Sequence, residues 1–209
     1  MHYLLFIHII AGTLSLLAAA LAVVSAKGKK VHIRAGRTYF WGMFLIFITA
    51  IPMSIISSNL FLFPVAIFSF YLAYAGMRFG RNRTGIASTF DWAAVGLMIL
   101  SGIAMWCLAT LYFINNNTQY ITLTVFGFIA ISLGYADFRS YRNKSAIGKK
   151  RIARHLTNML AGTIAVITAV LVTNVNIEPV FIFWILPTIL ITPLIFWWHR
   201  KTLSGNKIG

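Results

Sequence analysis

Three polar side chains stand at the ends of long apolar stretches, where they could bind a metal together. His32 precedes the second apolar stretch, Asp137 follows the fifth and His155 precedes the sixth. Imidazole and carboxylate groups are ligands for zinc and iron, and imidazole is also an axial ligand of haem iron. If the three residues meet at one membrane boundary, the sequence predicts a metal ion or a single b-type haem there. Asp137 would then be a ligand or would orient a histidine.

Asp137 is the acidic residue that helix capping does not explain. The chain has only three acids. Asp91 and Glu178 begin apolar stretches, where a carboxylate accepts hydrogen bonds from free N–H groups and complements the helix dipole. Asp137 ends a stretch, where the dipole disfavours a negative charge. We therefore expect either a structural ion pair with a nearby cation (Arg139, Arg142 or His155) or a functional carboxylate.

His8 lies inside the first apolar stretch, near its N-terminal end. Ionisable groups are expensive within a membrane and are functional candidates. Gly12 follows His8 by one helical turn, and Gly36 follows His32 at the same spacing, so a flat ligand or another helix could approach either imidazole. We expect His8 to form an outer-leaflet polar site, either as a packing histidine or as a ligand or proton site. Glycines are also expected at helix contacts, at Gly12, Gly36, Gly134 and Gly162.

Common catalytic motifs are missing from the sequence. There is no H-x-x-x-H, H-E-x-x-H or C-x-x-C pattern, no phosphate-binding glycine loop and no G-x-S-x-G segment. On the outer side only His2 and His8 could bind haem, and they lie on one helix, so two stacked haems are not expected. Whether the protein is an enzyme stays open.

The elements that position these residues are predicted to be membrane-spanning helices. The 209-residue chain is 59% apolar and only 10% charged, whereas soluble domains carry about 25% charged residues. A helix needs about 20 apolar residues to cross a bilayer. The sequence predicts an all-α bundle in one integral membrane domain, residues 1–209, with seven transmembrane helices near 3–26, 38–57, 60–77, 92–114, 120–136, 156–175 and 180–198.

The positive charges predict the orientation of this bundle. All 18 Lys and Arg residues fall between spans one and two, three and four, or five and six, or after span seven. Because positive residues mark the cytoplasmic side, we expect the N-terminus outside and the C-terminus inside, in a bacterial inner membrane. The formal charge of +15 then indicates contact with anionic lipid headgroups at the cytoplasmic face and gives no support for binding nucleic acid.

One segment carries a family resemblance. His32-x-x-x-Gly36-Arg37-x-Tyr39, with Met43 shortly after it, resembles a motif of the bacterial multi-pass membrane proteins grouped as the domain of unknown function twenty-three-oh-six. The first-span His8-x-x-x-Gly12 and the later set of Asp137, His155 and Met159 complete the pattern. The resemblance implies a membrane location and the same polar residues, and it implies no established activity.

Three functions are consistent with these patterns. The leading hypothesis is a metal or haem site on the cytoplasmic side of the bundle. The second is a transporter for a small solute or ion, which predicts a cavity reaching toward His8. The third is a non-catalytic subunit that packs against a membrane protein partner.

Overall fold

The computed structural model describes residues 1–175 and 177–204, and in this part of the chain the secondary structure is helical throughout. The predicted all-α class is therefore confirmed. The seven helices are α1 (His2–Val24), α2 (Lys30–Ile56), α3 (Leu62–Arg81), α4 (Thr89–Ile114), α5 (Tyr120–Arg142), α6 (Gly148–Asn174) and α7 (Phe181–Ser204).

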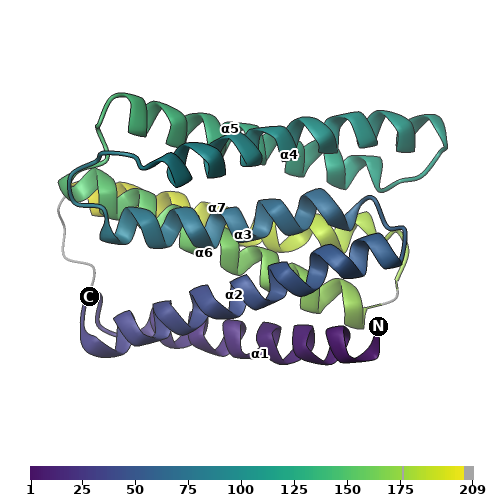
Figure 1. Cartoon of the computed structure of the whole chain (residues 1–209), viewed down its shortest axis with the longest axis horizontal. Helices are drawn as coiled ribbons and strands as arrows, with labels where there is room; N and C mark the ends of the chain where they lie inside the picture. The colour runs from purple at the N-terminus through teal and green to yellow at the C-terminus, as the bar shows by residue number, and fades with distance from the viewer. Residues whose placement is uncertain (176, 205–209) are drawn as a thin grey trace.

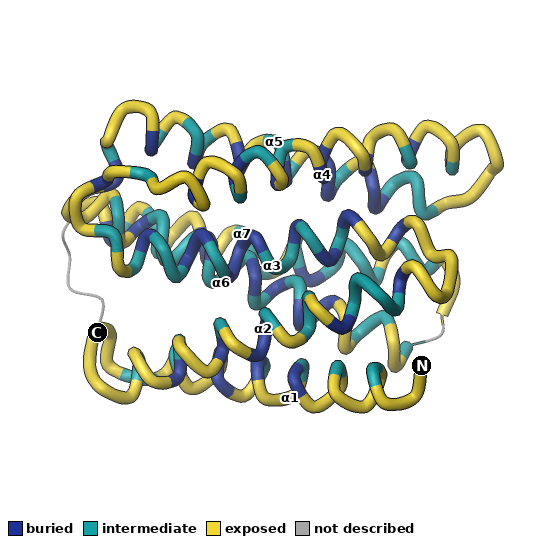
Figure 2. The backbone as a smooth tube through the Cα atoms, viewed as in Figure 1, coloured by how far each residue is buried: buried dark blue, intermediate teal, exposed yellow. Residues whose placement is uncertain are grey.

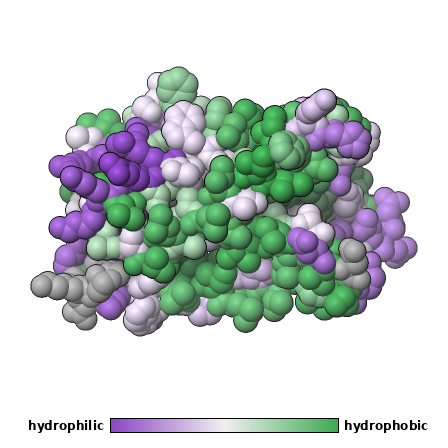
Figure 3. Space-filling view, turned by 90° about the horizontal axis from the view of Figure 1, so that it is seen from below, coloured by the Kyte–Doolittle hydropathy of each residue, from purple (hydrophilic) through white to green (hydrophobic). Residues whose placement is uncertain are grey.

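Each of these helices is long and apolar enough to cross a membrane. Large apolar side chains point outward along the middle of the bundle, such as Leu100, Phe128 and Leu190, which are more than 60% exposed. Figure 3 shows hydrophobic residues across the middle of one face and hydrophilic residues gathered toward its two ends. A surface of this kind is stable in hydrocarbon, where every backbone group is already bonded within a helix. The chain is a multi-pass membrane protein.

The helices form three layers (Figure 1). The α1–α2 hairpin lies on one side and the α4–α5 hairpin on the other, with α3, α6 and α7 between them. Helix α3 contacts α2, α4 and α6, so it joins the layers. Buried residues follow the inner faces of the helices, as Figure 2 shows. The main core cluster joins α3, α4 and α5 around side chains such as Leu72, Met98 and Leu123, which are fully buried.

Small residues bring several helices into close contact, as membrane helix packing requires. A Cβ atom added at Gly134 would lie 2.9 Å from the Ile99 side chain, and one at Gly162 would lie 2.5 Å from the Tyr39 hydroxyl. Gly134 and Gly162 therefore lie at close contacts between helices. Gly12 and Gly36 do not, because no atom lies within 4 Å of a Cβ added at either position. Each follows a histidine by one helical turn, a spacing that suggested a glycine at a helix contact. In the structure, however, the space beside both glycines is open.

The structure extends most helices beyond the charge-free stretches. Helix α2 begins at Lys30, so His32 is helical although it lies before the predicted span 38–57. A helix can continue past the hydrocarbon core, because its long basic side chains reach the headgroup region. The basic residues in the sequence therefore mark the membrane boundary better than they mark the end of the helix. The α1–α2 turn is correspondingly short and includes Gly28 at φ +75°, a conformation that favours glycine.

One end of the bundle collects the positive charge. The C-termini of α1, α3, α5 and α7 meet the N-termini of α2, α4 and α6 there, as the alternating direction of the helices requires (Figure 1). We call this the basic end, and its loops are residues 25–29, 82–88 and 143–147.

Candidate functional site

Two histidines from separate helices meet near the basic end. His32 lies in the first turn of α2 and His155 near the start of α6. Their imidazole rings are arranged edge to face, with ring centroids 6.2 Å apart and an interplanar angle of 77°. The structure thus brings together two of the three residues that the sequence singled out for metal or haem binding.

A backbone carbonyl fixes each of these imidazoles. His32 Nδ1 lies 3.0 Å from the carbonyl oxygen of Ala22 in α1, and His155 Nδ1 lies 2.7 Å from that of Gly76 in α3. A carbonyl can only accept a hydrogen bond, so both Nδ1 atoms must carry the proton. In the neutral form of each ring, Nε2 then keeps its lone pair. Fixing Nδ1 in this way is how proteins orient metal-binding histidines.

The approach of α3 to His155 depends on two glycines, Gly76 and Gly80. A Cβ atom added at Gly80 would lie 2.9 Å from His155 Nδ1 and 3.3 Å from its Cε1. At Gly76, an added Cβ would lie 2.8 Å from the Met159 side chain. Both distances are shorter than ordinary contacts. These two glycines therefore let α3 lie close enough to α6 for the Gly76 carbonyl to hold His155.

Asp137 belongs to a different cluster from the histidine pair. It is completely buried, and its Oδ1 lies 2.7 Å from Arg154 Nη2. The Tyr71 hydroxyl donates to its Oδ2 at 2.7 Å, and Asn158 Nδ2 lies 3.5 Å away. The carboxylate therefore joins α5 to α3 and α6 as a structural ion pair, and its cation is neither Arg139 nor Arg142.

The convergence predicted for His32, Asp137 and His155 is accordingly incomplete. Within residues 1–175 and 177–204, no three His, Cys, Asp or Glu side chains are grouped so that they could hold a metal ion. The reason is rotational: successive residues of α6 point in different directions, so Arg154 faces Asp137 while His155 faces α3. Of the three predicted metal ligands, only the imidazoles of His32 and His155 lie together in the described chain.

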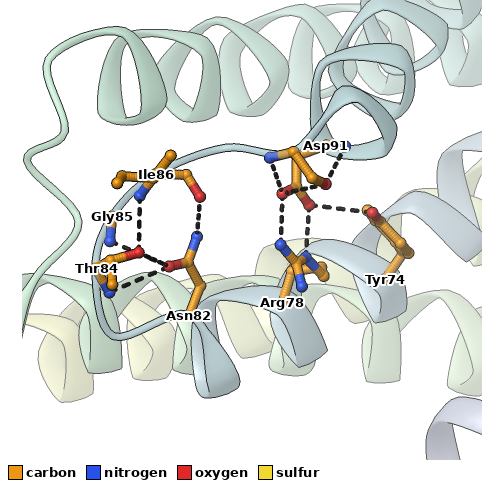
Figure 4. A network of polar contacts seen from close by, with 8 residues as sticks. Tyr74, Arg78, Asn82, Thr84, Gly85, Ile86 and Asp91 are labelled. Atoms are coloured by element: carbon orange, nitrogen blue, oxygen red, sulfur yellow. Dashed lines mark hydrogen bonds and ion pairs between the residues drawn. The ribbon is translucent and has the colours of Figure 1, made fainter.

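Asp91 has the capping role that the sequence predicted. The Ser88 hydroxyl accepts from the Asp91 N–H at 3.3 Å, and the Asp91 carboxylate accepts from the Ser88 N–H at 2.8 Å. The same carboxylate forms a bidentate pair with Arg78, with both distances 2.7 Å, and accepts from the Tyr74 hydroxyl at 3.0 Å (Figure 4). These contacts connect the end of α3 to the start of α4.

Asn82 shapes the loop between these two helices. Its Oδ1 accepts from the backbone N–H groups of Thr84 and Gly85, and its Nδ2 donates to the Ile86 carbonyl at 2.7 Å (Figure 4). The side chain thus supplies the hydrogen bonds that a tight turn lacks. All its partners and those of Asp91 are internal, and we assign this region a structural role.

His8 lies beside a large cavity. Its Nδ1 is 2.9 Å from the Thr49 hydroxyl of α2, so it has the interhelical hydrogen bond expected of a packing histidine. His8 and Gly12 also line a cavity of about 1280 Å³ between the helices. The open space beside Gly12 is part of this cavity.

Sequence reasoning missed Arg154 and the pairing of His199. Thr157 Oγ1 lies 2.9 Å from His199 Nδ1, and this contact joins α6 to α7. Arg154 lies one turn before Asn158, and both side chains contact Asp137, but this spacing alone does not distinguish Arg154 from His155. For His199 the sequence held no signal, because the register of α7 against α6 depends on the folded bundle.

Comparison with family models, with curated proteins and with solved structures finds no match to this chain. The resemblance of the His32–Tyr39 segment to the twenty-three-oh-six family therefore stays a prediction.

Proposed function

We propose that this protein is an electron-transfer protein of a bacterial inner membrane that binds one b-type haem between His32 and His155. The proposed orientation puts the N-terminus outside and the basic end in the cytoplasm, on the positive-inside rule. The observation that carries the proposal is the pair of imidazoles, each with Nδ1 held by a carbonyl of a neighbouring helix.

The spacing of the rings supports this assignment. An imidazole nitrogen binds a metal at about 2 Å, so two imidazoles that hold the same metal must lie close together. The rings of His32 and His155 are 6.2 Å apart. Gly36 lies on the His32 face of α2 with open space beside it, and a flat macrocycle needs such an approach.

The number of protein ligands favours haem over a bare ion. A zinc site normally has three or four protein ligands, and the described chain groups no three suitable side chains. Haem iron takes most of its ligands from the porphyrin and needs at most two from the protein. When bound, the haem would supply one-electron redox chemistry. His32 and His155 would hold its iron.

The test is an absorption spectrum and a metal analysis of the detergent-purified protein, oxidised and then reduced with dithionite. We expect about one haem iron per chain and its loss in both His32→Ala and His155→Ala. His2→Ala is the matched control, because His2 is an exposed histidine at the start of α1, and it should keep the cofactor. A folded protein without colour or metal, even after incubation with haem, would overturn the proposal. Metal without porphyrin absorbance would reject haem and retain the histidine site.

A second candidate function is transport of a small solute or ion, and the cavity beside His8 favours it. In proteoliposomes containing a pH-sensitive dye, a proton-coupled transporter would carry protons down an imposed gradient. His8→Ala should slow this flux while His2→Ala leaves it unchanged. Flux no greater than in empty vesicles would remove proton-coupled transport as a candidate.

A further inference from the structure

The large cavity has apolar walls and runs along most of α6. Its α6 wall extends from Arg154 to Asn174, which is about 30 Å of helix at 1.5 Å per residue. Its volume of about 1280 Å³ exceeds the roughly 300–1,000 Å³ of pockets for small ligands. Aromatic side chains such as Phe126 and Trp184 contribute to the wall. Length, volume and apolar lining suit a hydrocarbon chain better than a hydrated solute.

The end of the cavity that lies toward the basic end is polar. Arg154, Thr157 and His199 line it there. Thr157 and His199 are hydrogen-bonded across α6 and α7 at 2.9 Å. The Arg154 guanidinium contacts Asp137 through Nη2, but its buried Nε has no hydrogen-bond partner in the described chain. The Arg154 side chain as a whole is 15% exposed and lines the cavity, so its positive charge attracts an anionic group there.

The charge around this polar end favours an anion. The two acids near the basic end, Asp91 and Asp137, are each paired with an arginine. Glu178 precedes α7, at the opposite end of the bundle. The remaining Lys and Arg residues of the basic end thus have no acidic side chain to balance them. Basic pockets between membrane helices are a recognised site for anionic lipid headgroups.

We propose that this cavity binds an amphiphile whose hydrocarbon chain lies along α6 and whose anionic headgroup contacts Arg154, Thr157 and His199. A phospholipid and a free fatty acid share this chemistry. The site is separate from the proposed haem site, since neither His32 nor His155 lines the cavity. Either proposal can therefore fail without the other.

The test is native mass spectrometry of the full chain with phosphatidylglycerol, phosphatidylcholine or oleate added in turn. We expect one tightly retained phosphatidylglycerol or oleate, and whichever persists identifies the source. Ala165→Phe narrows the cavity wall and should weaken retention by about tenfold, equivalent to about 1.4 kcal/mol. The matched control is Ala104→Phe on the outer face of α4, since Ala104 is exposed and does not line the cavity. It should have no effect.

A second variant separates the headgroup contacts from the packing of the wall. Thr157→Val with His199→Leu removes the polar pair and should weaken anionic ligands more than phosphatidylcholine. It also keeps the test decisive if Ala165→Phe fails to fold. Equal retention of zwitterionic and anionic lipid would overturn the headgroup assignment. If Ala104→Phe lowers lipid retention as much as Ala165→Phe does, the lipid binds only to the outer surface. That result would overturn the proposed cavity site.

Discussion

The imidazoles of His32 and His155 lie edge to face, 6.2 Å between ring centroids, although each is held by a different neighbouring helix. His32 is oriented by α1 and His155 by α3. The pair therefore depends on how the α1–α2 hairpin docks on the central layer as well as on the two histidines themselves.

Gly80→Ala should disturb the histidine pair without touching either ligand. The new Cβ would lie 2.9 Å from His155 Nδ1, so the ring must move from its carbonyl partner. Changes to groups that orient metal ligands commonly lower metal affinity about 10–100-fold, and we expect a loss in this range in a haem titration. Gly96→Ala, where no atom lies within 4 Å of the new Cβ, is the matched control. Equal affinity in both variants would contradict the proposed role of the α3 contact.

Asp137 and Arg154 should behave as a coupled pair in unfolding experiments. Arg154→Met leaves a buried carboxylate without its cation, which costs about 3–5 kcal/mol. The double change of Asp137→Asn with Arg154→Met removes both charges and should recover much of this loss. Denaturant unfolding in detergent measures the loss of stability in the single variants and in the double variant. If the double variant is as unstable as the sum of the single variants, the two side chains do not stabilise each other.

Arg78→Lys should weaken the junction of α3 and α4. Arginine donates two parallel hydrogen bonds to Asp91, at 2.7 Å each, and lysine keeps the charge but cannot form this bidentate geometry. The expected cost is about 1–2 kcal/mol in the free energy of unfolding. Arg81→Lys, at an exposed position one turn later, should be neutral. Comparable losses in the two variants would point to a general charge effect.

Gly162→Ala should destabilise the protein, and Tyr39→Phe should rescue it. The added Cβ would lie 2.5 Å from the Tyr39 hydroxyl, and overpacking of this kind costs about 1–3 kcal/mol. The hydroxyl is buried and has no hydrogen-bond partner in the described chain, so Tyr39→Phe alone should be neutral or slightly stabilising. Thermal unfolding of the two single variants and the double variant measures the coupling, and additive effects would argue against the contact.

The features that sequence predicted well are those set by composition and local order. Seven helices follow from apolar length, because a bilayer demands about 20 residues per crossing. The cap at Asp91 follows from its place three residues after Ser88. Neither depends on how one helix is rotated against another.

The features that sequence missed depend on that rotation. Arg139 and Arg142 follow Asp137 closely on the same helix, yet the cation that reaches it is Arg154 of α6. Adjacent residues of α6 face different neighbours, so no spacing rule separates the role of Arg154 from that of His155. Gly12 and Gly36 show the same limit, since a glycine beside open space and a glycine at a helix contact look alike in sequence.

The position of the two histidines along the chain has a consequence for assembly during synthesis. His32 belongs to α2 and enters the membrane early, whereas His155 belongs to α6 and enters only after the three intervening helices, α3, α4 and α5. A cofactor held by both cannot be retained by the nascent chain until α6 has inserted beside α3. Loading of the site would therefore report that the bundle has closed, and truncated chains ending before α6 should emerge from the ribosome without it.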